Sequence, residues 1–406
     1  MEPERRIQGG TPACSDARYP PAATPRYSGS KAGKLPGAGL AKRRKAALVS
    51  PVLSLSDLSL EDFTARVEAW GGRPVHARQI LRSFYAGDGA VAWGEFELPR
   101  ALRGRIEAEC RVAPAQIAVR QVADDGTAKL LLRFEDGRTV ESVLMPDWQG
   151  ERAAGCVSSQ VGCAMGCDFC ATAQGGFARN LCSGEIVDQF FALRREAKAA
   201  GRKLQTLVFM GMGEPLLNLD NVVAAACRIA ANDLGALGRK QITVSTVGLV
   251  PGIQALTASG LGVSLAVSLH APDDATRARI LPAGRRHAVA EILAAADAHQ
   301  AATGRITTIQ YCLLAGVNDS LAQARALADV LEGRRMHVNL LRYNPTGPGL
   351  SGFDYRPPEM AGIEEFLVEL RGRGVVAHFR RPRGEGIDAA CGQLRGKVER
   401  PGRSLS

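Results

Sequence analysis

Cys156-Val-Ser-Ser-Gln-Val-Gly-Cys163-Ala-Met-Gly-Cys167-Asp-Phe-Cys170-Ala-Thr-Ala-Gln-Gly-Gly-Phe-Ala-Arg-Asn180 is the stretch of sequence that decides the fold. It holds four cysteines within fifteen residues, and the last three follow the spacing C-x3-C-x2-C. This spacing lets one loop bring three thiolates to three irons of a cubane cluster, while the fourth iron is left without a protein ligand. An open iron of this kind can hold a cofactor.

The same cysteines also allow a structural zinc site with Cys182 as the fourth ligand. Zinc modules usually pair two short cysteine knuckles across a spacer, whereas here three ligands share one loop that also contains Phe169. The spacing therefore favours the iron–sulfur cluster, and the zinc site remains the alternative.

The pattern resembles the radical S-adenosylmethionine (SAM) enzymes, in which the open iron chelates the amino and carboxylate groups of SAM. The wider run, from Cys156-Val-Ser-Ser-Gln to Thr172-Ala-Gln-Gly-Gly-Phe-Ala-Arg-Asn-Leu181, is similar to the RNA adenine methyltransferases of the RlmN and Cfr type. These enzymes methylate carbon 2 or carbon 8 of an adenine. The resemblance covers roughly residues 55–398. It implies a 4Fe-4S cluster held by Cys163, Cys167 and Cys170, and two SAM molecules per turnover.

Length and composition indicate a globular protein. A chain of 406 residues can bury an α/β core and one or two smaller modules. It has no apolar run near the roughly 20 residues that span a bilayer, and its N-terminus lacks the apolar core of a signal peptide. We therefore expect a cytoplasmic protein without a membrane partner. Ten cysteines are too few for a disulfide scaffold of this length, so their clustering favours metal chemistry in a reducing compartment.

The net charge of +10 is concentrated at the two ends of the chain. Residues 1–50 hold ten Lys and Arg against three Asp and Glu, and residues 371–406 hold nine against three. Such basic segments suit contact with the phosphates of RNA, although a solubilising tail is an equal alternative for residues 1–50.

The sequence divides into five segments. Residues 1–50 are rich in Pro, Gly, Ala and basic residues and are expected to form a disordered tail. Residues 51–115 show three helical patterns, from Leu60, from Val75 and from Pro99, and resemble the accessory domain that helps to hold RNA in the same family. In the second of these helices, His76, Arg78 and Arg82 are predicted to face solvent.

Residues 116–150 predict a connector with a β-hairpin around Glu135-Asp136-Gly137-Arg138. From 151 to 385, strand-like runs alternate with amphipathic helices, which indicates right-handed βαβ units and a parallel sheet. Six or so repeats suggest an open, partial (β/α)6 barrel, the radical SAM fold, rather than a closed eightfold one. Residues 386–406 form a C-terminal segment.

Polar groups follow the predicted strands, at the end where reactive groups lie in such barrels. Gly213 and Glu214 belong to a Gly-x-Gly-Glu-Pro loop that resembles the radical SAM motif for the amino group of SAM. Further residues match family positions that contact SAM: Ser245, Ser268, Leu269, His270 and Asn344. Taken alone, the polar residues among them are more often ones that form a turn.

Three residues outside the cluster match catalytic positions of the family. Cys391 lies in Asp388-Ala-Ala-Cys391-Gly-Gln-Leu394, the segment that carries the methyl-accepting cysteine, and its basic surroundings predict a lowered thiol pKa. Glu141, in mid-strand, matches the proton acceptor. Cys156 is our candidate for the thiol that later forms a disulfide with Cys391, which an external reductant then reopens.

The resemblance implies an RNA substrate, either rRNA or tRNA, an external electron donor and a protein that we expect to be a monomer. The ring position stays open: Gln310-Tyr311 and Arg342-Tyr-Asn-Pro345 lean towards carbon 8, whereas Arg383-Gly-Glu-Gly-Ile-Asp388 leans towards carbon 2. Two other functions remain possible, namely a radical SAM enzyme acting on a small molecule or peptide, and a non-enzymatic metal protein that binds RNA.

Overall fold

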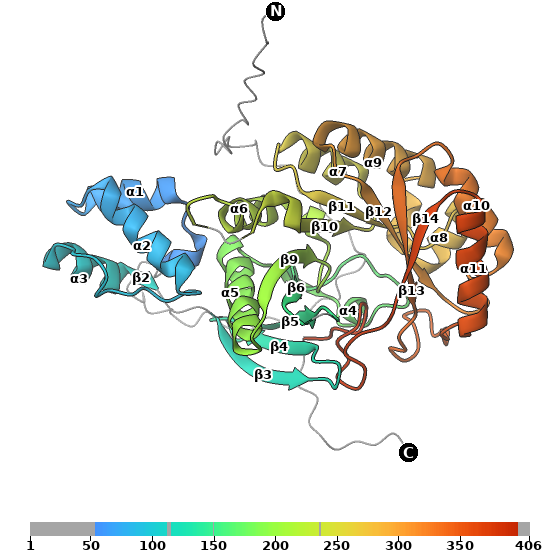
Figure 1. Ribbon diagram of the computed structural model, residues 1–406, viewed down its shortest axis with the longest axis horizontal. Coiled ribbons are helices and arrows are strands. Elements are labelled where there is room, and N and C mark those ends of the chain that lie inside the picture. The colour runs from blue at the N-terminus through green and yellow to red at the C-terminus, as the bar shows by residue number, and fades with distance from the viewer. Residues whose placement is uncertain (1–52, 112–114, 149, 235–236, 397–406) are drawn as a thin grey trace, which may run out of the picture. The chain divides into compact units, whose positions relative to one another are not determined.

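The computed structural model describes residues 53–111, 115–148, 150–234 and 237–396 (Figure 1). All of them belong to one compact unit that begins at Leu53. The predicted tail, residues 1–50, and the end of the C-terminal segment, residues 397–406, lie outside the described residues. In the described part of the chain, no helix combines the length and apolar character that a membrane crossing requires.

A ten-stranded sheet runs through the unit in the order β14-β13-β12-β11-β10-β9-β6-β5-β4-β3. Its parallel part consists of β6 Arg152–Cys156, β9 Lys203–Phe209, β10 Ile242–Thr246, β11 Ser264–Ser268, β12 Thr307–Leu313, β13 Met336–Arg342 and β14 Val376–Arg380. Each of these strands pairs with the next one along the chain. Within the described residues, β3 and β14 are paired on one side only, so the sheet stays open.

Helices connect the parallel strands and cover their outer face (Figure 1). The six crossovers contain α5 Ser183–Ala199, α6 Leu219–Ile229, α7 Val250–Ala258, α9 Val289–Thr303, α10 Leu321–Leu331 and α11 Met360–Gly372, with the short α8 Asp274–Ile280 before α9. The predicted partial (β/α)6 barrel is therefore confirmed. The sequence did not predict α7, because its first turn contains Pro251 and Gly252, which are tolerated there but weaken the helical pattern.

The predicted hairpin is present as β4 Ala128–Arg133 and β5 Thr139–Pro146. It extends the barrel sheet, because β5 pairs antiparallel with β6 and places Val143 opposite Cys156. The additional strand β3 Gln116–Val122 was not predicted, since it is exposed along most of its length and so lacks apolar alternation.

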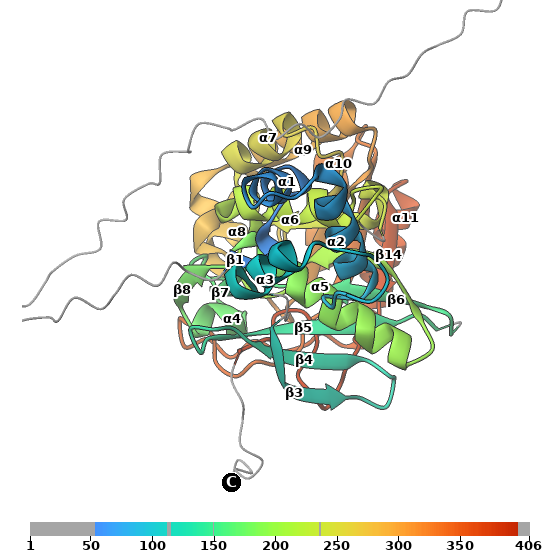
Figure 2. The ribbon, with the colours of Figure 1, turned by 90° about the vertical axis from the view of Figure 1, so that its left-hand side faces the viewer.

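Three helices precede the sheet, as predicted: α1 Leu60–Ala69, α2 Pro74–Ala86 and α3 Arg100–Glu109 (Figure 2). The Ser59 side chain caps the first of them, since its Oγ accepts a hydrogen bond from the amide of Asp62 at 3.0 Å. The prediction that His76 faces solvent is wrong. His76 is buried, and its Nδ1 accepts the amide of Arg73 at 3.2 Å, which satisfies a free donor at the start of α2.

These helices pack against α5 of the barrel. The rings of Phe84 and Tyr85 meet Phe191 edge to face, with centroids 5.2 and 5.1 Å apart. Next to them, the buried carboxylate of Asp88 pairs with Arg194. The helices, the hairpin and the barrel thus share one core, and the predicted boundaries between these segments stay predictions.

Candidate active site

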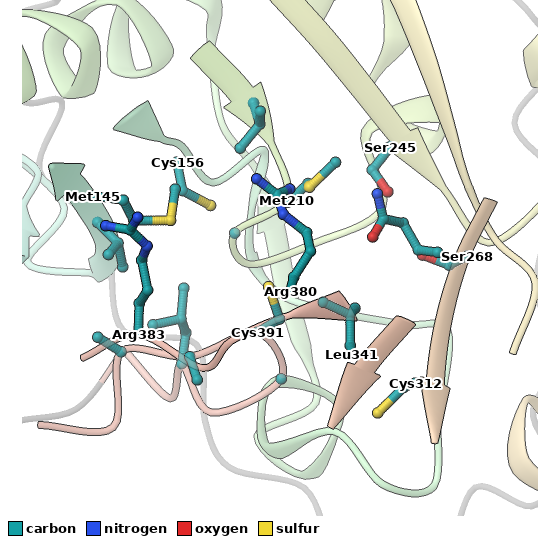
Figure 3. Close-up of a pocket in the computed structure, with 18 of the residues that line it drawn as sticks. Met145, Cys156, Met210, Ser245, Ser268, Cys312, Leu341, Arg380, Arg383 and Cys391 are labelled. Atoms are coloured by element: carbon teal, nitrogen blue, oxygen red, sulfur yellow. The ribbon is translucent and has the colours of Figure 1, made fainter. Parts of the chain in front are cut away.

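A cavity of about 590 Å³ lies at the carboxyl ends of the parallel strands. Its wall includes most of the predicted site residues: Cys156, Cys163, Cys167, Cys170, Gly213, Glu214, Ser245, Ser268, His270, Asn344 and Cys391. Figure 3 shows Cys156 on one side and Ser245 and Ser268 on the other, with Cys391 between them. The side chain of Leu269 is buried in the core and is not part of the wall.

The loop after β6 brings three cysteines to the cavity. A short hairpin of β7 Gln160–Gly162 and β8 Phe177–Asn180 closes this loop at its base. Gly162 has a φ of +76°, and a Cβ there would lie 1.9 Å from the carbonyl oxygen of Gly176, so only glycine permits this approach. The loop is thereby folded back on itself.

The chemistry of this loop fits an iron–sulfur cluster. Burial raises the pKa of Cys163 to about 12, and burial together with the charges of Cys170 and Cys163 raises the pKa of Cys167. Three neighbouring thiolates are costly in such a place unless a bound cation compensates their charge. All three cysteines are free thiols, so they would be available to hold a 4Fe-4S cluster.

Within the described residues, no group of three or more His, Cys, Asp or Glu side chains is arranged to hold a single metal ion. Cys182, the fourth ligand of the zinc alternative, caps α5: its own amide donates to Glu185 at 2.9 Å, and its side chain faces the amide of the same residue. A cubane cluster differs from a zinc ion because each thiolate binds a separate iron.

Asp168, between two of the cluster cysteines, fixes the loop to the segment after β13. One carboxylate oxygen accepts the amide of Ser351 at 2.7 Å, and the other accepts the hydroxyls of Ser351 at 2.6 Å and Tyr355 at 2.7 Å. The pKa of Asp168 is lowered, because these hydrogen bonds outweigh the opposing effect of burial. An ionised Asp168 thus holds two loops of the site together.

Glu214 is positioned by the Val-Ser-Ser-Gln run that precedes the cluster cysteines. The side chain of Gln160 accepts the amide of Glu214 at 2.8 Å, and Gly213 takes a φ of +101° so close to Gln160 that a Cβ would collide with it. The Glu214 carboxylate accepts the amides of Leu216 at 3.1 Å and Val247 at 2.9 Å. Burial raises its pKa to about 7, although these hydrogen bonds oppose the shift.

If Glu214 holds the amino group of SAM, as the resemblance implies, SAM binding should strengthen as the pH rises through about 7, because an ammonium group pairs with this carboxylate only when it is ionised. A raised carboxyl pKa means that the free protein still holds the proton near neutral pH and releases it when the cation binds. Below pH 7 the affinity should fall about tenfold per unit. Calorimetric titration of SAM into oxidised, cluster-loaded protein measures this slope. Glu214→Gln should bind weakly with a flat pH profile; an unchanged slope would assign the proton to another group.

His270 enters the cavity as a neutral imidazole. Burial, with the charge of Arg277 as a smaller cause, lowers its pKa to about 3. Its Nδ1 accepts the amide of Cys312 at 2.9 Å, so the proton of the ring lies on Nε2 and can be donated to a ligand. Phe169 of the cluster loop packs edge to face against the ring, with centroids 5.3 Å apart.

The prediction that basic surroundings lower the pKa of Cys391 is wrong. Cys391 exposes surface to solvent but lines the cavity, and desolvation there raises its pKa although Arg380 opposes the shift. In Figure 3 the side chains of Arg380 and Cys391 lie close to one another. The sequence shows the arginines near Cys391 but not the desolvation that outweighs them.

Two further thiols share the cavity with Cys391. Cys156 and Cys312 are both buried, and for both the pKa is raised by burial first and then by the neighbouring charge of Cys391. The sequence context of Cys312 gives no sign that this thiol lines the cavity. The structure therefore offers two partners for Cys391.

Glu141 is not part of the cavity wall. Its carboxylate is buried, accepts the amides of Arg395 at 2.6 Å and Gly396 at 3.0 Å, and pairs with Lys129 at 3.1 Å. In this conformation Glu141 thus holds the end of the C-terminal segment against β5. The backbone donors that occupy it follow Cys391 in the chain, and no sequence pattern signals such contacts.

Comparisons with known proteins agree with this geometry. The Radical SAM superfamily matches residues 157–328. A protein of Opitutus terrae named probable dual-specificity RNA methyltransferase RlmN 1 is 63% identical over 344 residues, which cover 85% of this chain and 97% of that protein. A Rhodopirellula baltica protein named probable dual-specificity RNA methyltransferase RlmN is 42% identical, covering 84% and 90%. The crystal structure of a radical SAM methyltransferase from Sphaerobacter thermophilus superimposes with a TM-score of 0.79 at 41% identity, covering 85% of this chain and all of that one.

Proposed function

We propose that this chain, which belongs to the RlmN family of radical SAM RNA methyltransferases, methylates a ring carbon of an adenine in rRNA or tRNA, with carbon 2 favoured. The observation that carries this proposal is that Cys391 lines one cavity with Cys156 and the three cluster cysteines, although Cys391 lies far from all of them in the sequence. Such an arrangement supports covalent methyl transfer through a protein thiol.

Cys163, Cys167 and Cys170 would hold the 4Fe-4S cluster, and Glu214 and His270 would orient SAM beside it. When bound, the cluster and SAM would supply a 5′-deoxyadenosyl radical that removes a hydrogen atom from a methyl group, and the cluster would take up the unpaired electron that is left after the carbon–carbon bond has formed. A cavity with apolar walls keeps water away from such a species.

Cys391 would first accept a methyl group from SAM by nucleophilic displacement. A carbon–sulfur bond forms at the Cys391 Sγ, the methyl–sulfonium bond of SAM breaks, and S-adenosylhomocysteine leaves. Because burial raises the pKa of this thiol, the reactive thiolate needs the positive charges of the sulfonium and of Arg380 nearby. The methyl carbon on Cys391 is then the atom that bonds to the adenine.

Release of the product would require a proton acceptor and a second thiol. Cys156 would attack the Cys391 Sγ, so that a sulfur–sulfur bond forms, the carbon–sulfur bond breaks, and the carbon that leaves takes up a proton. An external dithiol reductant would reopen the Cys156–Cys391 disulfide. Glu141 would take the ring proton only after its hydrogen bonds from the amides of Arg395 and Gly396 have broken.

Nucleoside analysis of cellular RNA, from cells with and without this protein, tests the proposal. We expect 2-methyladenosine to be present only with the protein, because the Arg383-Gly-Glu-Gly-Ile-Asp388 run leans towards carbon 2. Appearance of 8-methyladenosine would instead assign carbon 8. If neither nucleoside changes, while purified protein still cleaves SAM, the substrate is not an RNA adenine.

A further inference from the structure

An exposed tryptophan, Trp148, directly follows Pro146 and Asp147, which line the cavity. Trp148 follows β5, and 70% of its surface is accessible to solvent. The guanidinium of Arg383, which lines the cavity, lies over its ring at 4.3 Å from the centroid. Figure 3 shows Arg383 beside Met145 and Cys156, so the arginine that contacts the tryptophan also lies near one of the thiols of the cavity.

Hydrogen bonds hold the backbone on both sides of Trp148, whereas most of the tryptophan side chain is exposed to solvent. The side chain of Asp147 accepts the amide of Gly150 at 2.9 Å, and its carbonyl oxygen accepts Arg202 at 3.3 Å. The other side of the turn is fixed by Arg383, which donates to the carbonyl oxygen of Pro146. A large aromatic ring on a fixed turn can bind a flat partner without a large loss of conformational entropy.

Charge is the second observation at this site. The ring of Trp148 is accessible to a partner from solvent, and arginines lie on its cavity side. Arg380 and Arg381 leave β14 beside Arg383 and line the same cavity, and within the described residues neither forms an ion pair with an acidic side chain. The acidic groups that face Arg383 are Asp125 and Asp147. The surface around the ring is therefore positively charged on the cavity side.

We propose that Trp148, backed by Arg383, is the platform on which a base next to the target adenine stacks. The inference rests on the function proposed above, since a target adenine must leave its stack to enter the cavity. Every base has a flat π-face, and stacking on an aromatic ring beside arginines is a common way to hold single-stranded RNA. The occupant is thus an unpaired nucleotide of the RNA substrate, with its phosphates towards Arg380 and Arg381.

The test uses full-length, cluster-loaded protein and an RNA hairpin with one unpaired adenine, alongside hairpins with an abasic nucleotide on either side of that adenine. Trp148→Ala should weaken binding of the intact hairpin about tenfold, whereas Trp148→Phe should bind almost normally. In wild-type protein, one of the two abasic hairpins should bind about tenfold more weakly than the intact one. In Trp148→Ala this difference should disappear, because the stacking partner is gone.

Trp93→Ala is the control, because Trp93 also carries an arginine over its ring, Arg103 at 5.4 Å, but this arginine, unlike Arg383, does not line the cavity. This variant should keep the full sensitivity to the abasic hairpin. SAM-dependent methylation of Cys391, which needs no RNA, should proceed in every variant and shows that the site is intact. If wild-type protein neither binds nor methylates the hairpin, the proposed function fails. If it does both and Trp148→Ala retains the abasic effect or binds normally, the platform is refuted.

Discussion

Replacing Cys156 by alanine is expected to trap a covalent adduct between the protein and its RNA. In the proposed sequence Cys156 is the thiol that attacks the Cys391 sulfur, so without it the carbon–sulfur bond to the adenine persists. The reaction should stop after about one event per protein molecule. Anaerobic turnover followed by denaturing electrophoresis and mass spectrometry measures the adduct, which should map to Cys391.

Cys312→Ala provides the control, because Cys312 is also a buried thiol of the cavity wall whose pKa is raised by the charge of Cys391. We expect this variant to turn over normally and to accumulate no adduct. If Cys312→Ala traps RNA while Cys156→Ala does not, then Cys312 is the thiol that releases the product. Cys391→Ala should form no adduct when it is combined with Cys156→Ala or with Cys312→Ala, since the bond to the RNA is made through the Cys391 sulfur.

Local features of this fold could be predicted from the sequence. The central parallel strands, β10, β11 and β12, are largely buried on both faces, so they appear as short apolar runs between amphipathic helices. The cluster cysteines lie within one loop, and their spacing alone indicates their chemistry. The resemblance added the distant residues, and all but Leu269 and Glu141 proved to line the cavity.

The placement of the C-terminal segment could not be predicted, because isolated hydrogen bonds hold it and these leave no periodic trace. The carbonyl oxygen of Gly392 accepts the amide of Ala171 at 2.7 Å, and that of Leu394 accepts the hydroxyl of Thr172 at 2.6 Å. These bonds set Cys391 beside the cluster loop. They also explain the wrong pKa prediction, since they bring the thiol into a desolvated cavity that its sequence neighbours do not show.

Cys163→Ala is expected to abolish cluster binding and, with it, SAM cleavage. Two thiolates cannot hold three irons of a cubane, so the remaining cysteines lose their shared metal site. After anaerobic reconstitution, the iron and sulfide content should fall to background. Loss of a residue that only hydrogen-bonds to a metal ligand costs ~10–100-fold in activity, so loss of the ligand Cys163 should lower SAM cleavage by more than that. Electron paramagnetic resonance of the reduced protein then shows no cluster signal.

The informative comparison is with Cys182→Ala, because the zinc alternative makes Cys182 a ligand whereas the structure makes it the cap of α5. Loss of this cap removes one contact to the amide of Glu185 and should cost about 1 kcal/mol of stability without changing the iron content. The iron–sulfur assignment would be wrong if wild-type protein and both variants retained no iron, and if wild-type protein bound zinc but neither variant did. Retention of iron in Cys182→Ala and its loss in Cys163→Ala would instead place the cluster on the loop of three cysteines, which lines the same cavity as Glu214 and Cys391.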